Sequence, residues 1–285
     1  NRTANHHTPG LDRLVAPVVG VVGTPTGRGY WLADARGRVT AHGDAADLGS
    51  IDASLDRPVL GLAGLRPPPA EVTDILLDLP VLGPLVGNTP AGYWLVGGDG
   101  GIFAFGDARF HGSTGDLRLN RAMVGMAATP SGGGYWLVAG DGGIFAFGDA
   151  VFHGSTGSLR LNRPIVAMAA TPSGGGYWLV AGDGGIFGFG DAVFHGSTGN
   201  RVLDLPIVGM AATPTGGGYW LVAGDGGIFG FGDARSHGSL RDTGVSASIV
   251  AVAATRTGNG YWLASAHGEV FAFGDAGRHG GRTGG

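Results

Sequence analysis

The sequence predicts an all-β fold, a single β-propeller of four-stranded blades, from the period, composition and strand pattern of its repeats. A Tyr-Trp pair opens an apolar run six times, at 30–31, 93–94, 135–136, 177–178, 219–220 and 261–262. The last five pairs are 42 residues apart, and the first gap is 63 residues. Self-similarity at this period is typical of propellers, solenoids and arrays. No apolar stripe persists at helical spacing, because 60 glycines interrupt the chain.

One repeat, residues 164–205, contains four short apolar runs separated by turn-forming residues. Pro-Ser-Gly-Gly-Gly at 172–176 and Gly-Asp-Gly-Gly at 182–185 break the first three runs apart. Asp-Gly between apolar runs is a strong hairpin signal. The expected strands are, in order, 165–171, 177–181, 186–189 and 193–197. Four antiparallel strands in roughly 40–45 residues are the content of one propeller blade.

The second strand alternates Tyr and Leu with Trp and Val, as at 177–180. A period of two places Tyr and Leu on one face of the sheet and Trp and Val on the other. We therefore expect both faces to be buried between neighbouring blades. The first strand, rich in Ala, Gly, Val and Met, is expected nearest the propeller axis.

The repeats define the expected domain organisation. Residues 1–16 are a polar tail, or a segment in which residues 14–16 extend the last blade and help to close the ring. Residues 17–285 form one propeller, because six repeats occupy most of the chain. Its repeats are 17–57, 80–121, 122–163, 164–205, 206–247 and 248–285. Segment 58–79 is an insertion on a six-bladed ring or, as the alternative, the remnant of a seventh blade.

Composition excludes several classes of function. The net charge is −4 and there is no basic run, so we expect no nucleic-acid partner. There is no cysteine, which excludes disulfides and thiolate chemistry. The most apolar stretches are short and broken by Gly and Pro, so we expect no transmembrane segment, and no signal peptide is recognised. We also predict no cofactor, no metal site and no catalytic residue.

Acidic and histidine side chains recur at fixed positions of the repeat. Aspartate occupies the second turn (Asp99, Asp141, Asp183, Asp225) and the Gly-Asp-Ala turn (Asp44, Asp107, Asp149, Asp191, Asp233, Asp275). Histidine recurs at His111, His153, His195, His237 and His279. We interpret the aspartates as turn residues that accept backbone hydrogen bonds, and the histidines as hydrogen-bonded strand residues. His-Gly-Ser-Thr-Gly at 111–115, 153–157 and 195–199 is interpreted as a turn, because a nucleophile elbow requires glycine two residues before the serine.

Replication favours recognition over catalysis. A reaction needs one asymmetric set of groups, whereas equivalent weak sites around a ring give avidity towards a repetitive ligand. The second-to-third strand turn and the blade-to-blade connection should emerge on one face, where carboxylate, amide and guanidinium groups could bind sugar hydroxyls. The candidate binding residues are Asp141, Asp183, Asp225, Arg118, Asn120, Arg121, Arg160, Asn162 and Arg163, with Arg201 on the next connection. The expected partner is a glycan or cell-envelope polymer.

The motif YWLVAGDGGIFAFGDAVFHGSTG at 135–157 resembles a repeat found in tandem in secreted and cell-envelope proteins of actinobacteria. The resemblance covers residues 80–285 well and 17–57 weakly, and it implies an extracellular or cell-surface setting without implying a reaction. The blade pattern is also similar to NHL-type propellers and, in repeat length, to lectin propellers.

Two other functions remain open at this point. One is a hydrolase whose site lies near the irregular segment 58–79, around Glu71–Asp78. The other is a protein–protein interaction scaffold, in which a protein partner binds one face.

Overall fold

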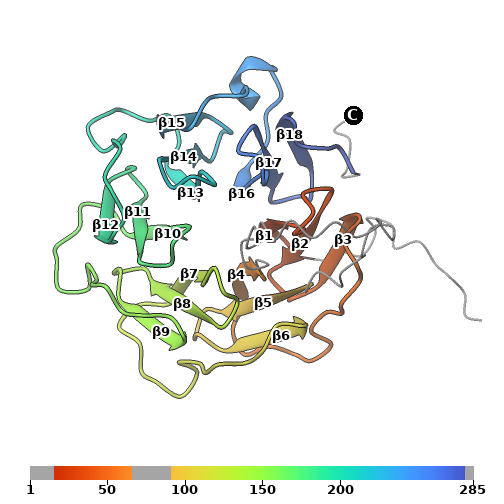
Figure 1. Ribbon diagram of the computed structural model, residues 1–285, viewed down its shortest axis with the longest axis vertical. Coiled ribbons are helices and arrows are strands. Elements are labelled where there is room, and N and C mark those ends of the chain that lie inside the picture. The colour runs from red at the N-terminus through yellow and green to blue at the C-terminus, as the bar shows by residue number, and fades with distance from the viewer. Residues whose placement is uncertain (1–15, 66–90, 280–285) are drawn as a thin grey trace, which may run out of the picture.

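The computed structural model describes residues 16–65 and 91–279, which form six antiparallel sheets arranged around a central axis (Figure 1). Each sheet is one blade of a propeller and contains three strands in sequence order. Blades 1 to 3 comprise β1 (Val18–Gly23), β2 (Gly29–Asp34), β3 (Val39–Gly43); β4 (Val59–Gly64), β5 (Gly92–Gly97), β6 (Ile102–Gly106); and β7 (Met123–Ala128), β8 (Gly134–Ala139), β9 (Ile144–Gly148). Blades 4 to 6 comprise β10 (Ile165–Ala170), β11 (Gly176–Ala181), β12 (Ile186–Gly190); β13 (Ile207–Ala212), β14 (Gly218–Ala223), β15 (Ile228–Gly232); and β16 (Ile249–Ala254), β17 (Gly260–Ser265), β18 (Val270–Gly274). A short 3-10 turn, η2 (Leu240–Asp242), lies between blades 5 and 6.

The same backbone hydrogen bond joins every pair of neighbouring blades. The N–H that opens the first strand of one blade donates to a carbonyl in the preceding blade's second turn, as from Ile165 to Gly140 at 3.0 Å. The closing junction has this bond too, from Val18 to Ala266 at 3.0 Å. The six blades therefore form a closed ring, and the closing junction leaves no place for the seventh blade that the sequence left open.

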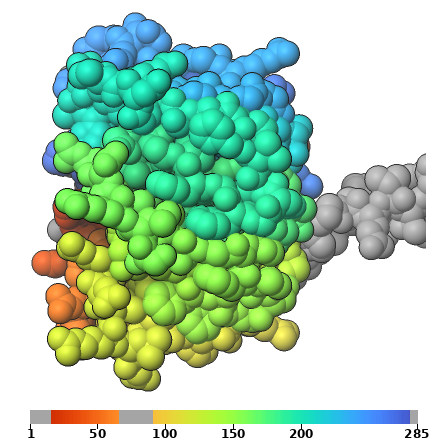
Figure 2. All heavy atoms as spheres, turned by 90° about the vertical axis from the view of Figure 1, so that its left-hand side faces the viewer, coloured from red at the N-terminus to blue at the C-terminus, as the bar shows by residue number. Residues whose placement is uncertain are grey.

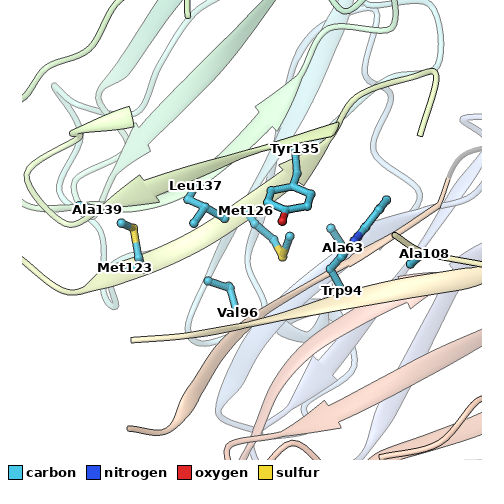
Figure 3. Packing of buried hydrophobic residues seen from close by; sticks show 9 residues of the cluster. All are labelled: Ala63, Trp94, Val96, Ala108, Met123, Met126, Tyr135, Leu137 and Ala139. Atoms are coloured by element: carbon cyan, nitrogen blue, oxygen red, sulfur yellow. The ribbon is translucent and has the colours of Figure 1, made fainter. Parts of the chain in front are cut away.

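The core is a set of layers between blades, as the alternation of the second strand predicts. Trp94 and Val96 of β5 pack against Tyr135 and Leu137 of β8, and all four side chains are buried (Figure 3). The Trp94 and Tyr135 rings are 5.5 Å apart in a tilted arrangement, a geometry that aromatic pairs favour. The first strands contact one another around the axis, which confirms their expected position.

The expectation of four-stranded blades is wrong in one respect. In the described residues each sheet has three strands, and the segment after the third strand, such as 149–156, runs along the blade without joining the ladder. Its carbonyls accept hydrogen bonds from side chains instead: Val151 from Trp136 Nε1 at 2.7 Å, and Gly154 from the Tyr177 hydroxyl at 2.6 Å. We call 149–156 and its equivalents the outer segments. Indole and phenol partners replace the strand partner that this backbone would otherwise need.

Blade 2 takes its first strand from an unexpected place. The sequence predicts a repeat beginning at residue 80, with 58–79 as an insertion or a degenerate blade. In the structure β4, Val59–Gly64, pairs with β5 in the standard register, so the chain enters this blade at residue 59. Residues 66–90 lie outside the described residues, as do residues 1–15, which include most of the expected ring-closing segment.

The two ends of the ring differ in what they carry. One end carries the turns between second and third strands and the blade-to-blade connections, because Gly140 N donates to Ala122 O and Ile165 N to Gly140 O. We call this end the connection face, and the other the hairpin face. The shared face that the sequence predicts for turns and connections is therefore confirmed.

Figure 2 views the ring edge-on, with the outer surface of the middle blades towards the reader. In the described ranges no helix has the length and apolar character needed to cross a membrane.

Candidate functional site

The aspartates of the second turns lie on the connection face and stabilise their own turns. Asp141 Oδ1 accepts a hydrogen bond from the Gly143 N–H at 3.0 Å, and Asp183 does the same from Gly185 at 3.0 Å. This confirms the turn role that the sequence predicts for these residues. Both side chains are half-buried, and in each the second carboxylate oxygen remains for other partners.

The candidate arginine and asparagine residues are exposed on the connections beside these turns. Two connections carry the same run, Arg-Leu-Asn-Arg, at 118–121 and 160–163. The leucine of each run packs into the core between blades, so the flanking polar residues remain exposed: Arg118, Asn120, Arg121, Arg160, Asn162 and Arg163. Gly140 N donates to Ala122 O and Gly182 N to Pro164 O, which brings each run against the turn of Asp141 or Asp183.

Blade 5 departs from this arrangement. Its preceding connection reads Val-Leu-Asp-Leu at 202–205 instead of Arg-Leu-Asn-Arg. Arg241 bonds Asp225 through Nε at 2.9 Å and through its terminal nitrogen, which also bonds Asp204. Burial raises the pKa of Asp225, but the hydrogen bonds from Arg241 and Gly227 outweigh it, so the pKa is below its usual value. Asp225 is therefore engaged within the protein, and only blades 3 and 4 combine a turn aspartate with the complete run.

The aspartates of the Gly-Asp-Ala turns lie on the hairpin face and connect two turns of the same blade. Asp149 Oδ1 accepts from the Thr129 hydroxyl at 2.8 Å, and Oδ2 accepts from Ser131. The sequence predicts backbone donors here; the structure shows mainly hydroxyl donors. Equivalent hydroxyl bonds to Asp44, Asp191, Asp233 and Asp275 recur in blades 1, 4, 5 and 6. Asp107 of blade 2 instead accepts from the backbone N–H of Ala91 at 2.9 Å, as the sequence predicts. These carboxylates are therefore structural.

The recurring histidines differ from the sequence prediction, which makes them hydrogen-bonded strand residues. They lie in outer segments, and the Nε2 atoms of His111, His153, His195, His237 and His279 are buried without a hydrogen-bond partner in the described part of the chain. The backbone N–H of His153 donates to the Tyr177 hydroxyl at 3.1 Å, and the two rings are 5.7 Å apart. The imidazole thus packs between blades as an aromatic spacer. No group of three His, Cys, Asp or Glu side chains in 16–65 and 91–279 is arranged to hold a metal ion.

One histidine breaks the repeat at the closing junction. His42 stands where the other blades have Phe, and its ring stacks on Tyr30 at 5.0 Å. Thr40 Oγ1 is 3.0 Å from Nε2. Burial lowers the pKa of His42; a hydrogen bond to the His279 backbone opposes this, and the nearby His279 side chain reinforces it. The packing of the junction between blades 6 and 1 therefore favours the neutral form of His42 by lowering its pKa.

Cavities along the axis are lined mainly by small apolar residues of the first strands. One, of about 400 Å³, opens on the hairpin face, and another, of about 310 Å³, lies towards the connection face. Met126, Met168, Met210 and Val252 line both. Arg256, whose Nη1 donates to Pro25 O at 2.8 Å, is the charged residue among the described residues that line the first cavity. The axis thus offers few groups for specific polar recognition.

Two features escape the sequence analysis. A cavity of about 540 Å³ on the connection face of blade 1 includes Arg36 and Arg38. In the sequence, the loss of the Gly-Asp-Gly-Gly turn at this position is the one sign of it. The second feature is an apolar strip on the outer segments of blades 2 to 4, made of Phe110, Val151, Phe152, Val193 and Phe194, each 57–61 % exposed. The segment Glu71–Asp78, around which the hydrolase hypothesis was built, lies outside the described residues.

Comparison with known proteins supports the fold. No family model matches the chain, and no curated protein matches it. Among solved structures, the chain is similar to the β-propeller domain of Cps50 (Swd1) from Myceliophteria thermophila, with a TM-score of 0.57 and 11 % sequence identity over 94 % of this chain and 86 % of that one. At this identity the likeness shows a propeller fold alone.

Proposed function

We propose that this propeller is a secreted, non-enzymatic recognition module that binds a carbohydrate or cell-envelope polymer through equivalent sites on the connection face. The observation that carries the proposal is the repetition of one polar set, Arg-x-Asn-Arg beside a turn aspartate, on two adjacent blades. Guanidinium, amide and carboxylate groups together offer donors and acceptors to sugar hydroxyls.

Geometry explains why such a set suits a polymer. Blades 3 and 4 are neighbours in a closed ring, so their sites face the same way and are related by one blade step. A ligand with repeating units can occupy both sites at once, and the second contact then benefits from a high effective concentration. Weak individual sites therefore give useful avidity without any new contact.

The proposal is tested with soluble cell-wall fragments and glycan oligomers in a binding screen, followed by Arg121→Gln and Arg163→Gln variants. Each single variant should weaken binding of the polymer by about tenfold, since hydrogen bonds to charged groups contribute about 1.5–3 kcal/mol. The double variant should reduce binding to the background level. Arg235→Gln, at an exposed arginine on the outer segment of blade 5, is the matched control and should bind as the wild type does.

A protein–protein scaffold is the second candidate, because one observation favours it. The apolar strip defined above spans three consecutive blades, whereas the positions of Phe110, Phe152 and Phe194 hold Asp47, Ser236 and Arg278 in blades 1, 5 and 6. Exposed apolar patches mark interaction surfaces, and here the same exposed apolar positions recur on three neighbouring blades. A Phe152→Ser, Phe194→Ser variant that loses a co-purifying protein, while retaining glycan binding, would assign protein recognition to this strip.

A further inference from the structure

The outer edge of the third strand in blade 4, β12, has no strand partner among the described residues, because the outer segment does not join the ladder. Asp191 N donates to Gly175 O at 3.1 Å, which fixes the alternation along the pairing of β12 with β11. In antiparallel pairs, bonded and non-bonded residues alternate. Ile186 and Gly188 therefore point their N–H and C=O groups away from β11 and towards the outside of the ring.

These backbone groups are open to another strand. In the described ranges no hydrogen bond reaches the outward groups of Ile186 or Gly188, whereas in blade 1 the matching N–H, of Val39, donates to Ser50 Oγ at 2.9 Å. Gly188 is exposed, while Ala146 at the same position of blade 3 is half-buried. β12 contains no charged residue and no proline, the devices by which natural edge strands avoid pairing with other chains.

Apolar outer segments lie on both sides of β12. Gly154 of the blade 3 segment packs against the ring of Phe189, and the Ala192 carbonyl of the blade 4 segment lies against the backbone on the opposite side. Both segments belong to the apolar strip, through the exposed side chains of Phe152 and Phe194. β12 lies on the left-hand side of the ring in Figure 1, the side that faces the viewer in Figure 2.

We propose that the outer edge of β12 binds an extended apolar segment of a partner protein, which joins blade 4 as its fourth strand. The alternating N–H and C=O groups of a strand edge are matched by the backbone of an extended peptide, and flanking side chains then select its residues. A second copy of this chain is a poorer match, because its own β12 lies between two outer segments that would meet those of the first copy. The site does not rest on the glycan positions of the connection face.

The experiment selects peptides from a random library of linear dodecapeptides, displayed on phage, against the purified protein. Enriched peptides should have an apolar centre without proline. Methylation of their central backbone nitrogens should weaken binding by at least about tenfold, because it removes the donors to the strand edge. On binding, amide hydrogen exchange should slow at Ile186 and Gly188 and stay unchanged at Ile228 and Gly230.

Gly188→Ala gives β12 the sequence of β9 and should weaken binding of the selected peptide by at least about tenfold. Gly230→Ala is the matched control. It places the same methyl group against the equivalent carbonyl, of Ala234, in blade 5, where the outer segment carries Arg235 and Ser236 instead of apolar residues. This variant should bind the peptide as the wild type does.

Phe194→Lys changes an exposed side chain beside the edge without touching the ladder, so it tests the site even if Gly188→Ala disturbs the blade. It should weaken peptide binding, and Phe110→Lys in blade 2 should not. The absence of any enriched peptide, or equal binding of the methylated and unmethylated forms, would overturn the proposal. A dimer of the free protein that Gly188→Ala converts to a monomer in sedimentation would assign the edge to a second copy and overturn it as well.

Discussion

The tyrosine hydroxyls of the second strands join neighbouring blades through hydrogen bonds to the backbone. Tyr177 donates to Gly154 O at 2.6 Å and accepts from His153 N at 3.1 Å, so one phenol satisfies two backbone groups of the preceding outer segment. Tyr135, Tyr219 and Tyr261 make the same pair of bonds. These bonds explain why the outer segment needs no strand partner.

Replacing Tyr177 by Phe should lower the free energy of unfolding by about 1–3 kcal/mol, because it leaves a backbone N–H and a carbonyl unpaired between blades. Urea denaturation followed by tryptophan fluorescence measures the change. Phe194→Leu, at an exposed side chain of the outer segment in blade 4, serves as the comparison and should change stability by less than about 0.5 kcal/mol. A Tyr177→Phe effect as small as that would show that the hydroxyl contributes no net stability.

His42 gives the closing junction a dependence on pH. Its folded pKa is below the value of 6.5 for a free histidine, so the unfolded chain binds more protons between the two values. The stability contributed by the neutral ring is present above pH 6.5 and is lost as the pH falls towards the folded pKa. His42→Phe, which restores the residue of the other blades, should flatten the fall in stability as the pH drops below 6.5.

Thermal denaturation at a series of pH values tests this dependence. His267→Gln, at an exposed histidine of blade 6, should keep the wild-type slope. If His42→Phe and the wild type lose stability in parallel as the pH falls, another group causes the loss.

At the scale of the element, the second turns depend on a glycine with a positive φ angle packed against the outer segment. Gly142 has φ +80°, and a Cβ there would overlap Thr156 Oγ1. Gly244 has a similar φ of +71°, but nothing lies within 4 Å of the position a Cβ would take. The two positions separate backbone strain from steric overlap.

Gly244→Ala should cost about 1–2 kcal/mol, the strain of a left-handed alanine, whereas Gly142→Ala should cost several kcal/mol more or prevent folding. Chemical denaturation of both variants provides the comparison. Equal costs would mean that the outer segment yields to the added methyl group.

The sequence predicts the second and third strands of every blade well, because their alternation and their Asp-Gly turns are local signals. It predicts the fourth strand wrongly, because apolar residues such as Val193 and Phe194 fit a strand. The structure shows instead that Trp178 Nε1 donates a hydrogen bond to the Val193 carbonyl, which therefore has no strand partner. The first strand of blade 2 was ambiguous: Pro-Val-Leu-Gly occurs at both 58–61 and 80–83. In the structure the first copy forms the strand, β4. The second copy is followed directly by Pro84, and proline is a poor strand residue because it has no backbone N–H to donate.

The sequence predicts one part of the candidate site and misses another. Repetition of Arg-x-Asn-Arg is visible in the sequence, and so is the shared face of turns and connections. The engagement of Asp225 depends on Arg241, which stands outside the repeat pattern in an unrelated stretch between blades 5 and 6. The cavity of blade 1 lies between a turn and a connection whose sequences differ from those of the other repeats, although the backbone hydrogen bonds that join them are the same.

At the scale of the whole molecule, the ring closes without exchanging strands between its ends. Blade 1 is built from β1–β3 and blade 6 from β16–β18, and the two meet through the same bond as every other pair. Each blade buries one face against each neighbour, so an open ring exposes Trp and Tyr faces at both ends.

Deletion of one whole repeat, residues 122–163, should therefore abolish cooperative unfolding, because five blades of this geometry cannot meet at the closing junction. An open array would instead lose stability by one increment per repeat. Sedimentation and a denaturation curve of the deletion variant decide between the two. A folded, monomeric five-bladed protein with a single sharp transition would contradict the dependence on closure.

The number of polymer-derived oligosaccharides bound per chain tests the central functional claim most directly. Only blades 3 and 4 combine a turn aspartate with the complete Arg-Leu-Asn-Arg run, so calorimetry with a fragment too short to bridge blades should give two equivalent sites. Arg121→Gln or Arg163→Gln should each reduce the number to one. A stoichiometry of six would attribute binding to features common to all blades, and the absence of any site that responds to these two substitutions would contradict recognition at the connection face.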